Sequence, residues 1–169
     1  MKKTVKHLLV SILAASSLCT SIPLSASAAT VSPQISENVS SGLVMVDQTV
    51  EHLADGGYIT IEIYESPSLS RAISQKQGRK VVTQSDSNGK MVWQYTLSAT
   101  FSVNSGVSAT CTKVTGTPSI YDTAWFTVSN TPNRSGNRAT GNITMQNRTS
   151  KQKVSRSVTL TCDAYGNLS

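Results

Sequence analysis

One stretch of the chain, residues 91–103, alternates between apolar and polar side chains. Every odd position is apolar, and every even position except Val92 is polar. Because successive side chains of a strand point to opposite faces, this pattern predicts a strand with one buried and one solvated face. At about 3.3 Å per residue the strand would be roughly 43 Å long, about twice a typical strand. We therefore expect a bend or a bulge within it.

Further alternating segments accompany this strand. Residues 58–65 place three isoleucines on one side and predict a second strand. Residues 80–84 are joined to the 91–103 strand by turn residues that include an Asn-Gly pair, so these two segments predict a hairpin. Additional short strands are expected within residues 107–112, 120–128, 139–145 and 154–162.

Several segments lack a strand period. The polar and basic residues 69–79 predict a loop or edge piece that crosses between sheets, and residues 130–137 predict a long polar loop. Gly116 and Pro118 are expected to interrupt a strand. Residues 43–53 fit either one face of a helix or the start of a strand, so both interpretations stay open.

The N-terminus has the pattern of a secretory signal peptide. Three lysines precede the apolar run 8–19, and an Ala-Ser-Ala sequence predicts cleavage before Ala29. We therefore divide the chain into a signal peptide (1–28), a leader with a poorly defined first element (29–52) and a secreted β domain (53–169). After processing, no apolar run is long enough to span a bilayer of ~30 Å, so no transmembrane segment is expected.

The succession of short strands and turns predicts an all-β fold, either an antiparallel β-sandwich of immunoglobulin-like architecture or an open barrel. Two cysteines follow the signal peptide, Cys111 and Cys162, and both fall in phase with the apolar faces of their strands. In an exported chain such a pair predicts one internal disulfide. The alternative is two buried free thiols.

Trp125 lies between the two cysteines, an order similar to the Cys…Trp…Cys order of immunoglobulin domains. Leu160 stands where those domains have the tyrosine of the tyrosine corner. An immunoglobulin relationship is therefore not indicated, and the predicted sandwich architecture does not depend on it.

Charge and composition narrow the classes of function. Removal of the signal peptide takes Lys and Arg from 15 to 12 against nine acidic residues, so the net charge falls from +6 to +3. This mild excess lacks the dense basic footprint of a nucleic-acid binder. His52 is the only histidine after the signal peptide, which gives no support for a histidine metal site or a Ser-His-Asp triad. We expect no cofactor and no metal.

Basic residues provide the main candidate binding site. If they share one face, they would hold an anionic cell-wall polymer, a lipid surface or another extracellular protein. The alternative is an ordinary surface of mixed charge. The six candidates are Arg134, Arg138, Arg148, Lys151, Lys153 and Arg156. Arg156 interrupts an apolar face, which predicts a place at its rim. A second basic run comprises Arg71, Lys76, Arg79 and Lys80.

Paired carboxylates would support a different function, that of an extracellular hydrolase. The candidate pairs are Glu62 with Glu65 and Asp122 with Asp163. A secreted toxin or antimicrobial factor is a further alternative. The expected function is a non-catalytic binding or structural module at the bacterial surface or in the medium.

Several motifs together resemble a known group of proteins. They are Gly89–Trp93, Ser108–Thr112, Tyr121–Trp125, Ser135–Gly141 and Val158–Ser169. These segments are similar to a family of uncharacterised small secreted proteins of Gram-positive, mainly clostridial, bacteria. The resemblance covers roughly residues 53–169. It implies secretion and a β fold, and no activity follows from it.

Overall fold

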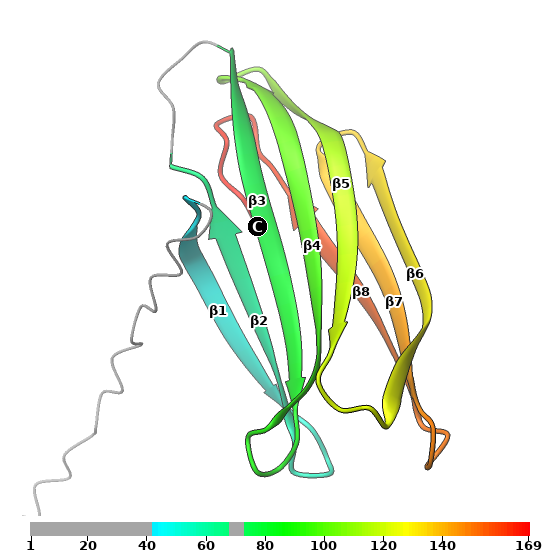
Figure 1. Ribbon diagram of the computed structural model, residues 1–169. Helices are drawn as coiled ribbons and strands as arrows, with labels where there is room; N and C mark the ends of the chain where they lie inside the picture. The colour runs from blue at the N-terminus through cyan, green and yellow to red at the C-terminus, as the bar shows by residue number, and fades with distance from the viewer. Residues whose placement is uncertain (1–41, 68–72) are drawn as a thin grey trace, which may run out of the picture. The chain divides into compact units, whose positions relative to one another are not determined.

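The computed structural model describes residues 42–67 and 73–169, in which the regular elements are eight β-strands (Figure 1). Five strands form a first sheet in the order β1-β2-β3-β4-β5, and three form a second sheet in the order β6-β7-β8. Neighbouring strands pair antiparallel. The strands are β1 Val44–His52, β2 Tyr58–Glu65, β3 Ile73–Ser85, β4 Met91–Asn104, β5 Ser108–Ile120, β6 Trp125–Ser135, β7 Arg138–Asn147 and β8 Lys153–Thr161.

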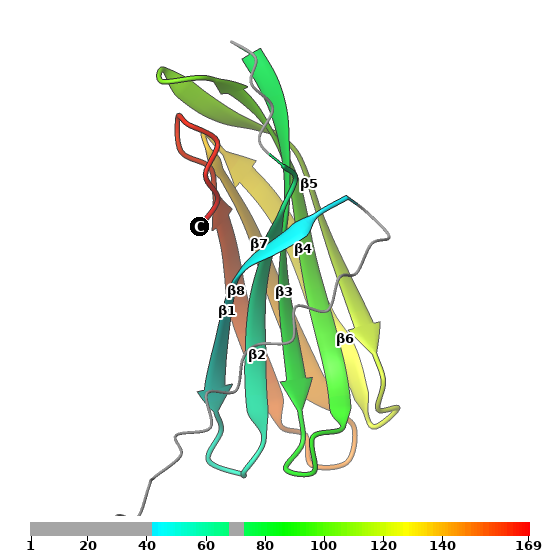
Figure 2. The same cartoon turned by 90° about the vertical axis from the view of Figure 1, so that its left-hand side faces the viewer.

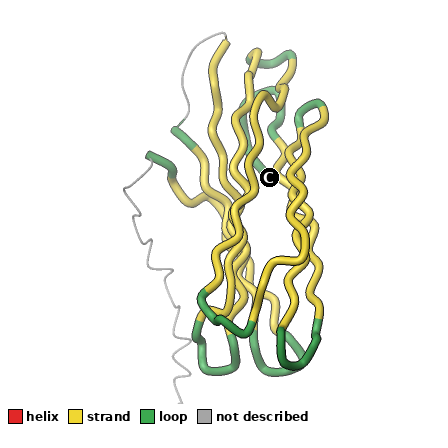
Figure 3. Tube along the Cα trace, turned by 45° about the vertical axis from the view of Figure 1, so that its right-hand side comes forward, coloured by secondary structure: helices red, strands yellow, loops and turns green. Residues whose placement is uncertain are grey.

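The predicted all-β, antiparallel fold is confirmed. Within residues 42–67 and 73–169 the two sheets form two layers, and they do not close into a barrel (Figure 3). The same residues contain no helix that is long and apolar enough to cross a membrane. The predicted signal peptide, the leader up to residue 41 and Arg71 lie outside the described residues.

One hydrophobic core lies between the inner faces of the two sheets, and β4 contributes most to it. The predicted alternation is confirmed along residues 93–103, whose odd-numbered side chains are buried and whose even-numbered ones are half-buried. It does not hold at the start of the strand, where Met91 is exposed and Val92 is buried. Burying one large apolar side chain contributes about 1.5–3 kcal/mol, so this strand is a main source of stability. The largest fully buried side chains are Trp93, Tyr95, Phe101, Ile59, Leu97, Ile143, Met145, Leu160 and Cys162.

The irregularity predicted for the long strand is present at Val92. This residue is left over between Met91 and Trp93 in the pairing of β4 with β3, which makes a β-bulge. Thr112 is left over in the same way in β5, opposite β4. A bulge bends a strand and increases its twist. Both strands nevertheless stay in the first sheet along their whole length.

The loop predicted for residues 69–79 is wrong for its described part, because residues 73–79 form the first half of β3. Inward positions of this half are occupied by Lys76 and Gly78 instead of large apolar residues, which hides the strand period. Lys76 is 5% exposed, and its ammonium group forms a 3.1 Å ion pair with Glu65 on β2. It also donates a 2.7 Å hydrogen bond to the carbonyl of Ser66.

The loop predicted for residues 130–137 is also wrong, since β6 continues to Ser135. Its polar side chains bond to neighbouring strands: Asn130 Nδ2 donates to the carbonyl of Gly116 at 2.8 Å. The interruption expected at Gly116 and Pro118 does not occur, and β5 passes through both residues. A Cβ at Gly116 would lie 3.0 Å from Cζ of Tyr95, so glycine is required here by close packing.

The open question about residues 43–53 is resolved in favour of a strand, β1. Among the described strands β1 is an edge strand, and it pairs with β2. Its valines are exposed, with Val44 at 54% and Val50 at 49%, and Met45 is half-buried. A strand whose two faces are largely exposed to solvent needs no alternation of apolar and polar residues. This explains why the sequence pattern was compatible with a helix as well as a strand.

The predicted disulfide is wrong: Cys111 and Cys162 are buried free thiols. The turn between β6 and β7 stands between their backbones. The N–H of Cys111 donates to the carbonyl of Gly136 at 2.8 Å, and the N–H of Cys162 donates to the carbonyl of Asn137 at 3.0 Å. Two segments on either side of an intervening backbone lie roughly 9–10 Å apart, beyond the ~7 Å between Cα atoms that a disulfide tolerates.

Candidate functional site

The first sheet has five strands and the second has three, so the two layers do not cover each other completely. Among the strands of the first sheet, β8 lies closest to β3 and β4. Its Arg156 side chain also reaches Glu51 of β1, and Ile59 and Ile63 of β2 are buried in the core. β8 is also the edge of the second sheet as far as the described strands go, because β7 is the only one of them that pairs with it. A free strand edge beside a partly covered inner face is a place where a further strand can add.

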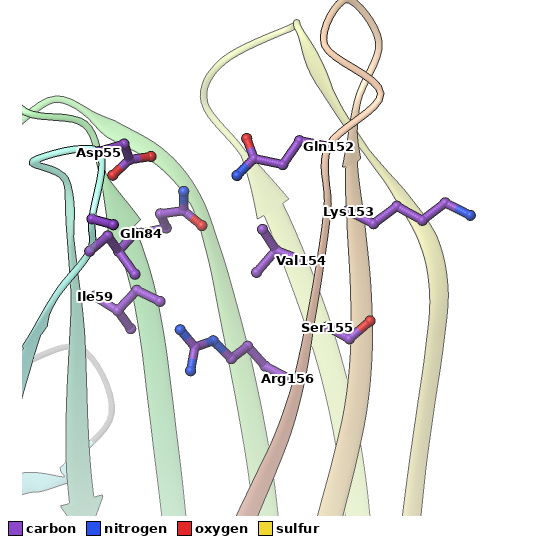
Figure 4. A pocket seen from close by; sticks show the side chains of 10 residues that line it. Asp55, Ile59, Gln84, Gln152, Lys153, Val154, Ser155 and Arg156 are labelled. Carbon is purple, nitrogen blue, oxygen red and sulfur yellow. The ribbon is translucent and has the colours of Figure 1, made fainter.

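A groove runs along the free side of β8. It consists of two cavities of about 410 and 280 Å³ that share Ile59 and Arg156. We call these two cavities the β8 groove. Figure 4 shows the larger one, with Ile59 and Gln84 on one wall and Val154 to Arg156 on the other. The main lining residues are Leu53, Ile59, Ile61, Lys80, Val154 and Arg156.

The apolar part of the β8 groove is incompletely covered. Leu53, Ile61 and Val154 pack against the core but are only partly buried. They come from the turn after β1, from β2 and from β8, so they surround the groove on several sides. An added strand with apolar residues on its inward face would complete their burial.

Polar atoms of the β8 groove lack partners. Gln84 is 6% exposed, and its Oε1 atom accepts no hydrogen bond within the described residues. Arg156 forms a 3.2 Å ion pair with Glu51 of β1 through Nη1, while its buried Nε has no partner there. Leaving a buried polar atom unpaired costs about 1–3 kcal/mol. The groove thus offers one acceptor and one donor to an incoming molecule.

Two further charges lie near the floor of the groove. Burial lowers the pKa of Lys80, and the carboxylate of Asp47 on β1 opposes this shift. Arg156, Lys153, Glu51 and Asp55 line the groove as well, so the groove region holds three basic and three acidic side chains. This balance favours a ligand of low net charge over a polyanion.

The last residues of the chain show how a strand fits beside β8. Residues 163–169, which we call the C-terminal hook, turn back at Asp163, whose Oδ1 accepts 2.8 Å hydrogen bonds from the N–H groups of Tyr165 and Asn167. The Asn167 side-chain amide, which donates to Oδ2, and these N–H groups lower the pKa of Asp163. The hook then runs antiparallel to the end of β8, with Leu168 opposite Cys162.

The hook occupies only the end of the β8 edge. Thr161 and Ser169 exchange two hydrogen bonds, of 2.8 and 3.0 Å, through their N–H and C=O groups. Alternate residues of a strand direct these groups to the same side. The N–H and C=O groups of Thr159, Ser157 and Ser155 therefore also face the open side, where no described strand pairs with them.

Leu168 is the inward-facing side chain of the hook. It fills the space over Gly78 of β3 that any Cβ there would occupy, next to Leu160. The glycine is thus needed for close approach and not for a turn. The same contact shows that an apolar side chain of a strand added beside β8 can pack against the first sheet.

The six basic candidates do not form one surface. Arg138 begins β7, whereas Arg148 follows the end of β7, so they lie at opposite ends of a strand roughly 30 Å long. Lys151 and Lys153 are exposed at the same end of β7 as Arg148, in the β7–β8 turn and at the start of β8. Arg156, predicted at the rim, lines the β8 groove.

Two of these basic side chains are engaged by the protein itself. Arg134 Nη1 donates to the carbonyl of Cys111 at 3.2 Å and also to the carbonyl of Thr112, which secures the bulge of β5. Arg148 lies over the ring of Phe126, 4.7 Å from its centroid. These contacts are structural cation–π and hydrogen-bond interactions.

The candidate carboxylates are not brought together in pairs. Glu62 accepts a 2.8 Å hydrogen bond from the Tyr64 hydroxyl on the outer face of β2, whereas Glu65 bonds the buried Lys76 on the inner face. Asp122 caps the β5–β6 turn through the N–H of Ala124. Asp163 holds the C-terminal hook. Nor do the described residues contain a group of three His, Cys, Asp or Glu side chains that could hold a metal ion.

The two thiols are suited to a core and not to chemistry. Burial raises the pKa of Cys111 and raises that of Cys162 to about 11. Both side chains therefore stay protonated near neutral pH, whereas the thiolate is the reactive form of cysteine.

The β8 groove could not be predicted from the sequence because no motif encodes it. It results from the unequal number of strands in the two sheets.

Compared with known proteins, the chain matches no protein-family model, no curated protein and no solved structure.

Proposed function

We propose that the protein is an exported, non-catalytic binding or structural module that binds an extended polypeptide in the β8 groove. One observation carries this proposal: the C-terminal hook pairs with β8 at Thr161 and leaves the rest of that edge open. Strand addition of this kind obtains affinity from main-chain hydrogen bonds and selectivity from pockets for alternate side chains. Polar side chains on the inward face of the added strand would face the unpaired atoms of Gln84 and Arg156.

The sequence supports export to the bacterial surface or the medium. The signal-peptide pattern before Ala29 and the resemblance to small secreted Gram-positive proteins both favour it, and membership of that family stays a prediction. An immunoglobulin-like sandwich is the finer description of the two layers that we favour. An anionic cell-wall polymer is a weaker ligand candidate, because five of the six basic residues are divided between the two ends of β7 and Arg156 lies level with its middle.

Ser157 offers a direct test of strand binding. Its N–H faces the open side of β8. Ser157→Pro therefore removes one backbone donor that an added strand would use, without breaking the pairing with β7. Ser157→Thr keeps the N–H and is the matched control. A phage-displayed library of short random peptides would be selected against the processed protein at low concentration.

We expect enriched peptides with apolar residues at alternate positions, which bind the wild type and Ser157→Thr but not Ser157→Pro. Equal binding to both variants, or no enrichment, would contradict a strand-binding groove. Secretion from a Gram-positive host followed by N-terminal sequencing tests export separately, with Ala29 as the expected first residue.

A further inference from the structure

We propose that the occupant of the β8 groove is the leader, residues 29–41, of a second copy of this chain, so that the protein assembles head to tail. This inference rests on the strand-binding function proposed above and names its ligand. It is carried by the position where the described chain begins, the pattern of the leader sequence and the direction of free backbone groups on β8.

The described chain begins on the side of the first sheet that faces away from the groove. Leu43 lines a cavity with Gln77, Arg79 and Ser98, which alternate with the inward Gly78, Lys80 and Leu97 and therefore lie on the outer face. Figure 2 shows the start of β1 crossing the first sheet on this face. To reach its own groove, the leader would have to pass around the edge of the sheet, whereas the groove of a neighbouring molecule is open to it.

The leader is long enough for this role. Its 13 residues would extend roughly 43 Å, while the open edge of β8 from Lys153 to Thr159 spans only about 23 Å. Several residues therefore remain to link the inserted part to β1 of the molecule that donates it.

The apolar residues of the leader fit one face of a strand. Val31, Ile35 and Val39 all occupy odd positions, and the even positions from 32 to 40 are polar. With odd residues inward, the apolar side chains would meet Leu53, Ile61 and Val154, which the protein leaves partly uncovered. Glu37, the only charged residue of the leader, falls on the same inward face, where Lys80 and Arg156 lie near Asp47 and Glu51.

Proline at position 33 agrees with this orientation. In the hook, the residue that bonds to β8 is Ser169, whose partner Thr161 has an outward side chain. By the same alternation, the even residues of an added leader direct their N–H groups to β8, and the odd residues direct theirs away. Pro33 lacks an N–H and falls on an odd position, where none is needed and where it would prevent a further strand from adding.

The groove and the leader are different surfaces of the same molecule, so their contact is heterologous. Such a contact produces a ring when the rotation between copies closes and an open filament when it does not. Each copy then donates one leader and accepts one, and the assembly grows with protein concentration.

Two variants separate donor from acceptor. Ser36→Pro removes an N–H that the leader would direct to β8, with Ser36→Val as its control. Ser157→Pro disables the acceptor edge, with Ser157→Thr as its control. The side chain of Ser157 is exposed on β8, and circular dichroism with thermal unfolding tests whether each variant folds.

Sedimentation velocity of the processed full chain is the measurement. We expect concentration-dependent oligomers for the wild type and both controls, and monomers for each proline variant. A mixture of the two proline variants should stop at a 1:1 dimer, because only one leader and one groove remain competent. A synthetic peptide of residues 29–41 should dissociate the wild-type oligomers and bind Ser36→Pro at least about tenfold more tightly than Ser157→Pro.

Several results would overturn the inference. Monomeric wild type, oligomers that persist in both proline variants, or a mixture that grows beyond the dimer would each do so. A monomer whose own leader protects the β8 edge from hydrogen exchange would also refute assembly. If selected library peptides bind the groove but the leader peptide does not, strand binding stands and the leader is the wrong occupant; if neither binds, both proposals fail.

Discussion

Tyr95 on β4 and Gly141 on β7 touch across the core, so closely that a Cβ at position 141 would lie 2.8 Å from Cε1 of the tyrosine ring. Gly116 on β5 approaches the same side chain. The hydroxyl of Tyr95 donates a 3.1 Å hydrogen bond to Asn130 Oδ1. Two glycines and one amide thus accommodate a fully buried tyrosine, and they fix how closely the two sheets approach there.

Substitution of either glycine by alanine is therefore expected to destabilise the protein. Overpacking in a core costs about 1–3 kcal/mol, and we expect Gly116→Ala and Gly141→Ala to fall in this range in urea unfolding. Tyr95→Phe removes the hydroxyl that lies nearest to both positions, so the double variant Tyr95→Phe/Gly116→Ala should lose less than the sum of its parts. Additive losses would show that the tyrosine hydroxyl does not set the spacing.

Strands that bury one complete face could be predicted from the sequence. β2 and β4 carry apolar residues at every second position because one side of each meets the core. The first half of β3 could not be predicted in this way. Its inward residue Lys76 forms an ion pair with Glu65, and Leu168 packs against the backbone of its inward residue Gly78. In these places the inward position is satisfied by a partner distant in sequence, and a local pattern cannot report it.

The candidate site could be predicted even less. Arg156 was identified as an interruption of an apolar face, but its partner Glu51 lies on another sheet and far away in sequence. The predicted disulfide is wrong for a related reason. The alternation of apolar residues predicts that Cys111 and Cys162 are buried, but it cannot show that the β6–β7 turn separates them. Strand number, sheet order and intervening turns are properties of the assembled fold.

The buried ion pair between Lys76 and Glu65 leads to a second prediction. The side chains are 7% and 22% exposed, so removal of one partner leaves a charge with little access to water. We expect Glu65→Gln to cost about 3 kcal/mol, because it leaves the more buried lysine unpaired. Lys76→Met should cost less, since Glu65 retains contact with solvent.

Urea unfolding of the double variant Lys76→Met/Glu65→Gln completes this cycle. It should be more stable than Glu65→Gln alone, because no buried charge remains without a partner. A double variant that is no more stable than Glu65→Gln would indicate that Lys76 contributes through its hydrogen bond to Ser66 and its packing instead.

The two free thiols give a third prediction. Cys111 is 4% and Cys162 0% exposed, so a thiol reagent such as Ellman's reagent should react with neither in the folded protein. After unfolding in urea without reductant, both thiols should react. Mass spectrometry that shows a linked pair in secreted protein would contradict this result.

Alkaline pH should destabilise the fold through Cys162. Burial raises the pKa of this thiol from its usual 9.0 to about 11. Folding therefore favours the protonated thiol. Its contribution to the free energy of unfolding is complete below about pH 9 and is lost as the pH rises through the pKa of the folded state. A shift of this size corresponds to roughly 2–3 kcal/mol. Burial also raises the pKa of Tyr95 and Cys111, which adds loss in the same direction.

Urea unfolding near pH 8 and above pH 10 measures this loss, with Cys162→Ala as the control. The alanine variant should be less stable at the lower pH, because it loses packing, but it should lose less on going to the higher pH. An identical pH dependence in both proteins would assign the alkaline loss to other groups.

Hydrogen exchange should divide β8 into a protected end and an open remainder. The N–H of Thr161 donates to the carbonyl of Ser169, whereas those of Thr159, Ser157 and Ser155 face the groove without a described strand partner. In the Ser36→Pro variant, in which the leader is not expected to insert, NMR-detected exchange should be slow at Thr161 and fast at the other three. Because all four residues belong to one strand, the difference in exchange rate reports the protection that the hook gives to Thr161 and not the stability of the strand.

Leu168→Ala provides the matched perturbation. It removes the side chain that anchors the hook over Gly78, so the hook should detach more often and exchange at Thr161 should approach that of its neighbours. The alternate residues whose N–H groups face β7 should stay protected, because the β7–β8 pairing is unchanged. Slow exchange along all of β8 in both variants would mean that the edge is covered, and the groove could then not receive a strand.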